Sequence, residues 1–182
     1  MRFRSQLQRQ LTLALRRLRL ALRRLGLALR SLMLAPAPAV GEVPAGLAGV
    51  WRLKTFVSED AHSGERKTVL GHRPNGCLVL TSSGQVLAIL TARKRAVTAP
   101  LTDADRITAY DSIIAYSGTY HVEGTIFTTT VDMAWNEGWV GTNQVRHYRI
   151  EGSTLYIETP PTPSADHGGR TVRFLLSWKR ES

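Results

Sequence analysis

The chain has 182 residues, of which 43% are hydrophobic and 21% charged, and this length allows one globular domain plus a tail. A formal net charge of +10 would suggest an acidic partner if the basic residues were spread over the whole chain. Nine of the 24 basic residues lie within residues 1–34, where there is no acidic residue. Residues 35–182 carry 15 basic against 14 acidic residues, so this part gives no electrostatic reason to expect a nucleic-acid partner.

The residue types that build metal and cofactor sites are sparse. Cys77 is the one cysteine, so no disulfide can form within the chain, and its alternating apolar neighbours favour a small buried side chain over a reactive thiol. The sequence has no CxxC, HExxH, P-loop or GxGxxG motif. The histidines lack metal-ligand spacing, so we expect no metal and no cofactor. They are His62, His72, His121, His147 and His167.

Residues 1–34 form a repetitive tail rich in Leu, Ala and Arg. Leu-Ala-Leu-Arg-Arg-Leu occurs at 13–18 and again at 20–25, and a variant follows at 27–32. The composition predicts a helical or disordered tail. Arginines interrupt every apolar run, which argues against a transmembrane span and a secretory signal. Two interpretations stay open: weak contact with an anionic membrane surface or a targeting role, or a low-complexity segment outside the native protein, with Met33 as the start.

Three prolines make residues 35–46 a linker, and residues 47–182 are rich in short β-type runs. Only 102–116 has helical character, with Thr102 or Asp103 as its cap. Eight or nine short strands without a βαβ rhythm predict an antiparallel sandwich or barrel. The expected strands are 49–57, 65–71, two within 73–92, 115–122, 125–133, 141–150, 153–159 and 170–180, with a loop at 160–169.

Alternation of side chains along these strands predicts which residues share a face. The first strand places Trp51, Leu53, Thr55 and Val57 together, and Asn75-Gly76 is a turn signal. The strand 125–133 places Phe127, Val131 and Met133 together.

Several segments together carry a resemblance to a known family. Residues 47–180 resemble the microbial lipocalin-like domain proteins, through "LAGVWRL" (47–53), "RPNGCLVLTSSGQV" (73–86), "AYSGTYHVEG" (115–124), "WNEGWVGTNQVRHYRIEGSTLYIET" (135–159) and "LSWKR" (176–180).

The resemblance implies a closed antiparallel up-and-down β-barrel of about 8–10 strands with one short helix and an internal cavity. It also implies that Trp51 packs across the barrel floor under an arginine of the last strand, Arg180, with Arg173 as the alternative. The resemblance further implies a bacterial protein with a role in secondary metabolism. We expect this protein to be cytoplasmic.

The strand 142–150 is unusual because neither of its faces is purely apolar. The family pattern implies that Gln144 and Arg146 point inward, while His147 points outward. Two explanations are open for the inward arginine: a structural network with Asp132 or a tyrosine hydroxyl, or the orientation of a ligand carboxylate or carbonyl.

Four aromatic residues accompany this strand. Tyr116 and Tyr120 share a face, where they either pack or donate hydrogen bonds, and Trp135 and Trp139 either close the barrel or cover its rim. The candidate ligand-binding residues are thus Tyr116, Tyr120, Trp135, Trp139, Gln144 and Arg146, and Trp51 and Arg180 are structural candidates.

The resemblance, together with these residues, leaves three functions open. The first is a barrel that binds a small, mostly apolar molecule with a polar head group. The second is a cyclase or isomerase that acts on a polyketide-like substrate in the same cavity, and the third is a barrel filled by its own side chains. No catalytic residue is assigned, and Ser117 has no evident His–Asp partner for a triad.

Overall fold

The computed structural model describes residues 43–93, 95 and 99–181, apart from the side chain of residue 166. The predicted tail 1–34 and the linker up to residue 42 lie outside the described residues.

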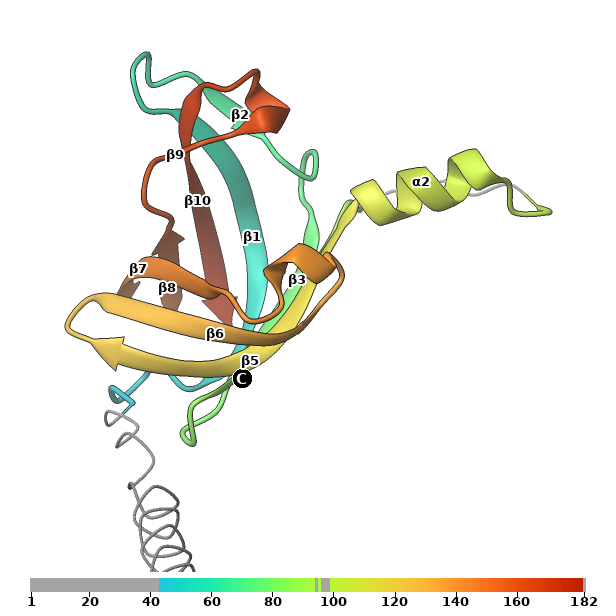
Figure 1. Ribbon diagram of the computed structural model, residues 1–182. Helices are drawn as coiled ribbons and strands as arrows, with labels where there is room; N and C mark the ends of the chain where they lie inside the picture. The colour runs from blue at the N-terminus through green and yellow to red at the C-terminus, as the bar shows by residue number, and fades with distance from the viewer. Residues whose placement is uncertain (1–42, 94, 96–98, 182) are drawn as a thin grey trace, which may run out of the picture. The chain divides into compact units, whose positions relative to one another are not determined.

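Eight of the described strands close into an antiparallel up-and-down barrel (Figure 1). The order around the barrel is β1-β3-β4-β5-β6-β7-β8-β10, and β10 pairs with β1 again. The predicted closed barrel with one helix is therefore confirmed. The eight strands are β1 (Gly49–Asp60), β3 (Asn75–Leu80), β4 (Gln85–Thr91), β5 (Ile113–Glu123), β6 (Ile126–Ala134), β7 (Asn143–Glu151), β8 (Thr154–Glu158) and β10 (Thr171–Arg180).

Two short strands and two single-turn 3-10 helices complete the barrel. The strand β2 (Arg66–Thr68) pairs with β1, and β9 (Thr162–Pro163) pairs with β10. The 3-10 helix η1 (Glu137–Trp139) connects β6 to β7, and η2 (Ala165–His167) follows β9.

One end of the barrel is closed by Trp51 and Arg180, which are register partners on β1 and β10. The guanidinium carbon of Arg180 lies 4.2 Å from the ring centroid of the fully buried Trp51, within cation–π range. Arg180 also donates to the carbonyl oxygens of Ala48, at 2.9 Å, and of Gly46. The Trp51 Nε1–H donates to the Leu47 carbonyl at 3.0 Å. These bonds fix the chain that enters β1 against the end of β10.

A bulge in β1 changes which of its residues face inward. The pairing with β10 shifts between Leu53 and Thr55, so the alternation reverses there. Phe56 and Ser58 are buried as a result, whereas Thr55 is exposed. The prediction that Thr55 and Val57 share the face of Trp51 is wrong, because one extra residue in the strand moves the following side chains to the other face.

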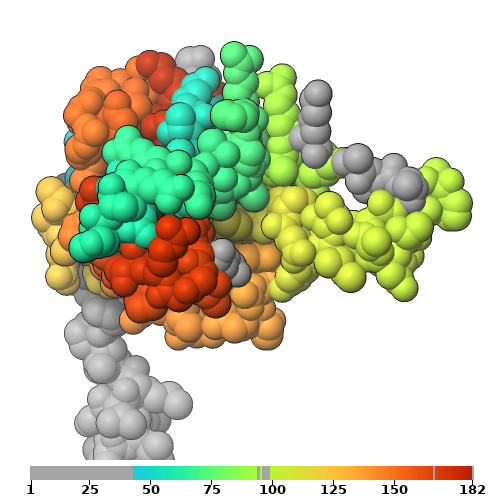
Figure 2. Space-filling view, turned by 90° about the horizontal axis from the view of Figure 1, so that it is seen from above, coloured from blue at the N-terminus to red at the C-terminus, as the bar shows by residue number. Residues whose placement is uncertain are grey.

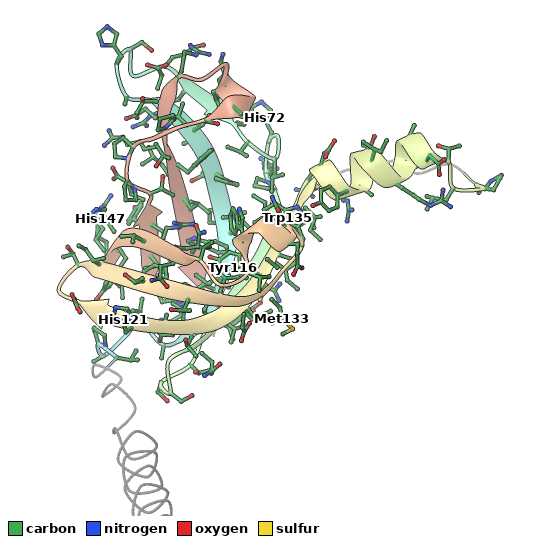
Figure 3. The ribbon with its side chains drawn as sticks, viewed as in Figure 1. His72, Tyr116, His121, Met133, Trp135 and His147 are labelled. Atoms are coloured by element: carbon green, nitrogen blue, oxygen red, sulfur yellow. The ribbon has the colours of Figure 1, made fainter. Side chains whose placement is uncertain are left out.

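A second bulge has the same effect in β6. Ser117 is opposite Met133 and Gly118 is opposite Val131, which leaves Asp132 as the extra residue. Met133 is 66% exposed, so its predicted place beside Phe127 and Val131 is also wrong. Figure 3 shows Met133 on the outside of the barrel.

Asn75 and Gly76 begin β3 rather than forming a turn. The turn between β3 and β4 is at residues 82–84, and it is closed by the Thr81 N–H, which donates to the Gln85 carbonyl at 2.9 Å. Gly76 serves close packing instead, since a Cβ atom there would collide with the side chain of Leu53.

The helix α2 (Asp103–Asp111) is shorter than the predicted segment 102–116. It begins with a capping box, in which Thr102 and Asp105 exchange hydrogen bonds between side chain and backbone. Ile114 already belongs to β5. The helix projects away from the barrel in Figure 1 and buries none of its residues.

At the far end of β1, the carboxylate of Glu59 forms ion pairs with two arginines. Glu59 is 6% exposed and accepts hydrogen bonds from Arg173 Nε at 2.7 Å and from Arg66 Nε at 2.5 Å. Arg173 also donates to Glu158 at 2.8 Å. The hydrogen bonds from Arg173 and Arg66 hold the pKa of Glu59 below its ordinary value. Together, the four residues connect β1, β2, β8 and β10.

The variant Glu59→Gln tests the contribution of these ion pairs to stability. A carboxyl whose pKa is lowered in the folded state stabilises the fold above its ordinary pKa, and this contribution is lost as the pH falls through the lowered value. We expect a lower melting temperature for Glu59→Gln at pH 7 and a difference from the wild type that shrinks below about pH 4. Melting curves from pH 7 to pH 2 measure it. Glu181→Gln, which removes the exposed pair with Arg52, serves as the control with a small change. A difference that does not depend on pH would contradict the assignment.

Candidate functional site

The barrel encloses a cavity of about 730 Å³. This volume lies within the range of small-molecule sites, so the barrel is not filled by its own side chains. The cavity reaches the surface at the beginning of β7 and at β9, because Asn143, Thr162 and Pro163 line it and are exposed. Most of its wall is apolar, including Phe56, Leu78, Ala88, Leu90, Ile114, Phe127, Ile157, Phe174, Leu176 and Trp178.

The polar part of the wall comes from β7, whose residues alternate strictly. Gln144 and Arg146 are half-buried and line the cavity, whereas His147 is exposed on the other face. Arg146 donates from Nη1 to the Val145 carbonyl at 2.8 Å and from Nη2 to Gln144 Oε1 at 3.2 Å. Gln144 in turn donates to Thr142 Oγ1 at 2.9 Å. The hydrogen-bonded side chains of Gln144 and Thr142 therefore hold the Arg146 guanidinium in place within a mostly apolar cavity.

Arg146 has no counter-charge within the part of the chain that the structure describes. Asp132, the carboxylate suggested by the structural-network explanation, is exposed and accepts a hydrogen bond from Ser117 at 2.5 Å instead. That pairing is therefore wrong, because Asp132 is the bulged residue of β6 and faces outward. Burial lowers the pKa of Arg146, an effect opposed by the neighbouring Tyr116, but arginine still keeps its proton.

An aromatic group stands beside Arg146 in the cavity wall. The Tyr116 ring lies 5.7 Å from Trp139, and Trp139 lies 4.8 Å from Trp135, both between ring centroids. Tyr116 and Trp135, both labelled in Figure 3, line the cavity. Burial raises the pKa of the Tyr116 phenol, and Arg146 acts in the opposite direction. The Tyr116 hydroxyl makes no hydrogen bond to any described residue, so it remains a neutral donor inside the cavity.

The structure does not bring Tyr120 to this group. Tyr120 is 2% exposed, and its hydroxyl donates to the Thr81 carbonyl at 2.8 Å. Burial raises its pKa to about 12. It does not line the cavity, so its geometry is that of a packed core residue with a satisfied hydroxyl.

A histidine that the sequence did not single out also lines the cavity. His167 belongs to the closing loop, residues 159–170, which includes β9 and η2. Its Nε2 lies 2.9 Å from Ser58 Oγ, and its Nδ1 lies 3.0 Å from Ser164 Oγ. Ser58 is 109 residues away in the chain and faces inward only because of the bulge in β1, so no sequence pattern joins the two residues.

The closing loop lies next to the segment that contains β2. Lys67, Thr68 and Val69 share the lining of a surface depression with His167 and Arg170. Figure 2, which looks at the molecule from above, shows the corresponding red and green segments beside each other. The barrel end near Glu59 is thus covered by residues from both segments.

Two further observations concern metals and membranes. No group of three His, Cys, Asp or Glu side chains in the described ranges is placed to hold a metal ion. None of the helices within those ranges has the length and apolar character needed to span a membrane.

Comparison with known proteins places the fold in a family. The model of the lipocalin-like domain family matches residues 48–181, which is the whole barrel. No curated protein matches the chain. Barrels of this kind generally bind small hydrophobic ligands, in agreement with the apolar cavity found above. The chain belongs to the lipocalin-like domain family.

Proposed function

We propose that the barrel binds a small apolar molecule that carries a carboxylate or similar anionic head group, and that Arg146 holds this group. One observation carries the proposal: Arg146 is charged, lies in an apolar cavity and has no carboxylate partner among the described residues. Removing an unpaired charge from water is costly, and an anionic ligand would supply the missing partner.

The surroundings of Arg146 support an anchoring role. A guanidinium has five N–H donors, and the structure shows two hydrogen bonds from Arg146 to other residues. Its bond to Gln144 limits the rotation of the side chain, so less entropy is lost when an anion binds. The free hydroxyl of Tyr116 can donate to a second ligand oxygen.

The apolar part of the ligand would contact the aromatic side of the cavity. Trp135 and Trp139 line it together with Tyr116, and they form a continuous ring contact. Tryptophan offers a large rigid surface for an apolar molecule at little conformational cost. A role in microbial secondary metabolism belongs to this proposal and rests on the family resemblance alone.

A second candidate is a cyclase or isomerase in the same cavity. The observation in its favour is the pairing of an unbonded Tyr116 hydroxyl with the Arg146 charge, since both can stabilise negative charge that develops on a substrate oxygen. Turnover separates the two candidates: a binding protein releases its ligand unchanged, whereas an enzyme releases an isomer.

The variant Arg146→Met tests the anchor. Displacement of the fluorescent anion 1-anilinonaphthalene-8-sulfonate measures the affinity for dodecanoate and for dodecanol. We expect the wild type to prefer dodecanoate, and Arg146→Met to lose about 10- to 100-fold in dodecanoate affinity with little change for dodecanol, because a hydrogen bond to a charged group contributes about 1.5–3 kcal/mol.

Arg149→Met is the matched control, because Arg149 lies on the same strand, is exposed and pairs with Glu151. It should bind both probes as the wild type does. Arg146→Met should melt at or above the wild-type temperature, because no ion pair to the described residues is lost. Strong destabilisation of Arg146→Met, or equal dodecanoate binding by all three proteins, would favour a structural role for Arg146.

A further inference from the structure

Three hydrogen bonds in a row connect the cavity to the backbone of β2. Ser164 Oγ lies 3.0 Å from His167 Nδ1, His167 Nε2 lies 2.9 Å from Ser58 Oγ, and Ser58 Oγ donates to the Lys67 carbonyl at 3.4 Å. A serine within hydrogen-bond reach of a histidine, whose other nitrogen is held by a third group, is the arrangement of an activated nucleophile.

Nucleophile activation uses one of the two tautomers that this row allows. In that tautomer the His167 Nε2–H donates to Ser58 Oγ, whose own proton points to the Lys67 carbonyl 3.4 Å away. The Nδ1 atom then has a free lone pair and accepts the hydroxyl proton of Ser164. In this state the imidazole is positioned to remove the proton from Ser164.

Burial distinguishes the two serines. Ser58 is 2% exposed and lies behind the ring, whereas Ser164 is half-buried and lines the cavity together with His167. The loop holds Ser164 in place, because its carbonyl accepts from the amides of His167 and Gly169 at 3.1 and 2.8 Å. Ser164 is therefore the end of the row that a bound molecule can reach.

We propose that Ser164 is a nucleophile for acyl transfer from apolar esters, with His167 as its general base and Ser58 as a positioning residue. Ser164 Oγ attacks the ester carbonyl carbon while its proton passes to His167 Nδ1, which gives a tetrahedral alkoxide. This collapses by breaking the bond to the leaving oxygen, which takes the proton from His167. Water then attacks the acyl-serine and gives a proton to His167 Nδ1. The second tetrahedral alkoxide collapses by breaking the bond to Ser164 Oγ, which takes that proton back from His167 as the carboxylic acid leaves.

This activity goes beyond ligand binding, and it rests on the proposed function only in that an ester must enter the same cavity. The group behind His167 is a hydroxyl instead of a carboxylate, so it orients the ring without stabilising the imidazolium charge. In serine proteases, replacing that carboxylate by an amide lowers turnover about 10⁴-fold. We therefore expect slow hydrolysis and an acyl-enzyme or phosphonyl adduct that can be isolated.

Covalent labelling of the full chain tests the proposal. The protein is incubated with p-nitrophenyl hexanoate and, separately, with an alkyl fluorophosphonate, and the adduct is located by intact mass and peptide mapping. The wild type should release p-nitrophenol and carry one adduct, on Ser164. Ser164→Ala should lose the adduct, and His167→Gln should slow its formation at least about 100-fold. Ser58→Ala should slow it with the adduct still on Ser164, and Ser58→Thr should restore the rate.

Ser117→Ala is the matched control, because Ser117 is also bonded to an ionisable side chain, Asp132, but on the outside of the barrel. It should be labelled on Ser164 as fast as the wild type. Melting curves show which variants fold, and a folded wild type that gains no adduct on Ser164, or an adduct on another residue alone, overturns the proposal. A wild type that binds dodecanoate but is not labelled refutes the nucleophile and leaves the binding function standing. Labelling of Ser164 without dodecanoate binding supports the nucleophile and refutes the anionic ligand.

Discussion

The site depends on the half-buried guanidinium of Arg146, which has no ion-pair partner among the described residues. Its charge lies in a wall that is otherwise mostly apolar, and no carboxylate of the described residues neutralises it. A fold tolerates such a group only when hydrogen bonds or a bound anion offset the loss of hydration. Gln144 and the Val145 carbonyl provide part of this compensation. In the proposed function, the remaining N–H donors of Arg146 bind an anionic head group.

The rest of the barrel keeps that cavity open. Trp51 and Arg180 fix one end of the β1–β10 pair, and Glu59 and Arg173 fix the other end. Closure of the sheet removes free strand edges, and the buried apolar residues form one cluster that includes Trp51. The cavity is thus what remains between a packed floor and a loop that crosses the far end. His167 belongs to that loop, and its hydrogen bond to Ser58 holds it against β1. The loop therefore both covers the cavity and supplies its second polar group.

Residue patterns predicted an antiparallel sandwich or barrel and the alternation of β7, and the family resemblance predicted that the barrel is closed. That strand has no bulge within its paired region, so Gln144 and Arg146 could be assigned to one face by counting. Counting failed in β1 and β6, where one extra residue reverses the faces after Leu53 and at Asp132. A bulge depends on how two strands meet, which is a tertiary property.

The contacts of His167 and Ser58 could not be predicted for a related reason. The histidine lies in a loop that no periodic pattern describes, and the serine turns inward only after the β1 bulge. The role of Gly76 could not be predicted either. Asn75-Gly76 is a typical hairpin-turn pair, but in the structure Gly76 lies in β3, where its lack of a side chain makes room for Leu53. Local chemistry therefore predicted most of the strands and the family resemblance predicted the inward arginine, while the partners of these groups came from the closure of the barrel.

Native mass spectrometry of the full chain, purified without detergent from cells that supply its ligand, tests the central claim most directly. We predict that each chain carries one small molecule, that this molecule is released on denaturation, and that it contains an apolar body with an acidic group. Arg146→Met should be recovered folded and free of it. Recovery of a bare wild-type chain, or of the same amount of ligand on Arg146→Met, would contradict the account.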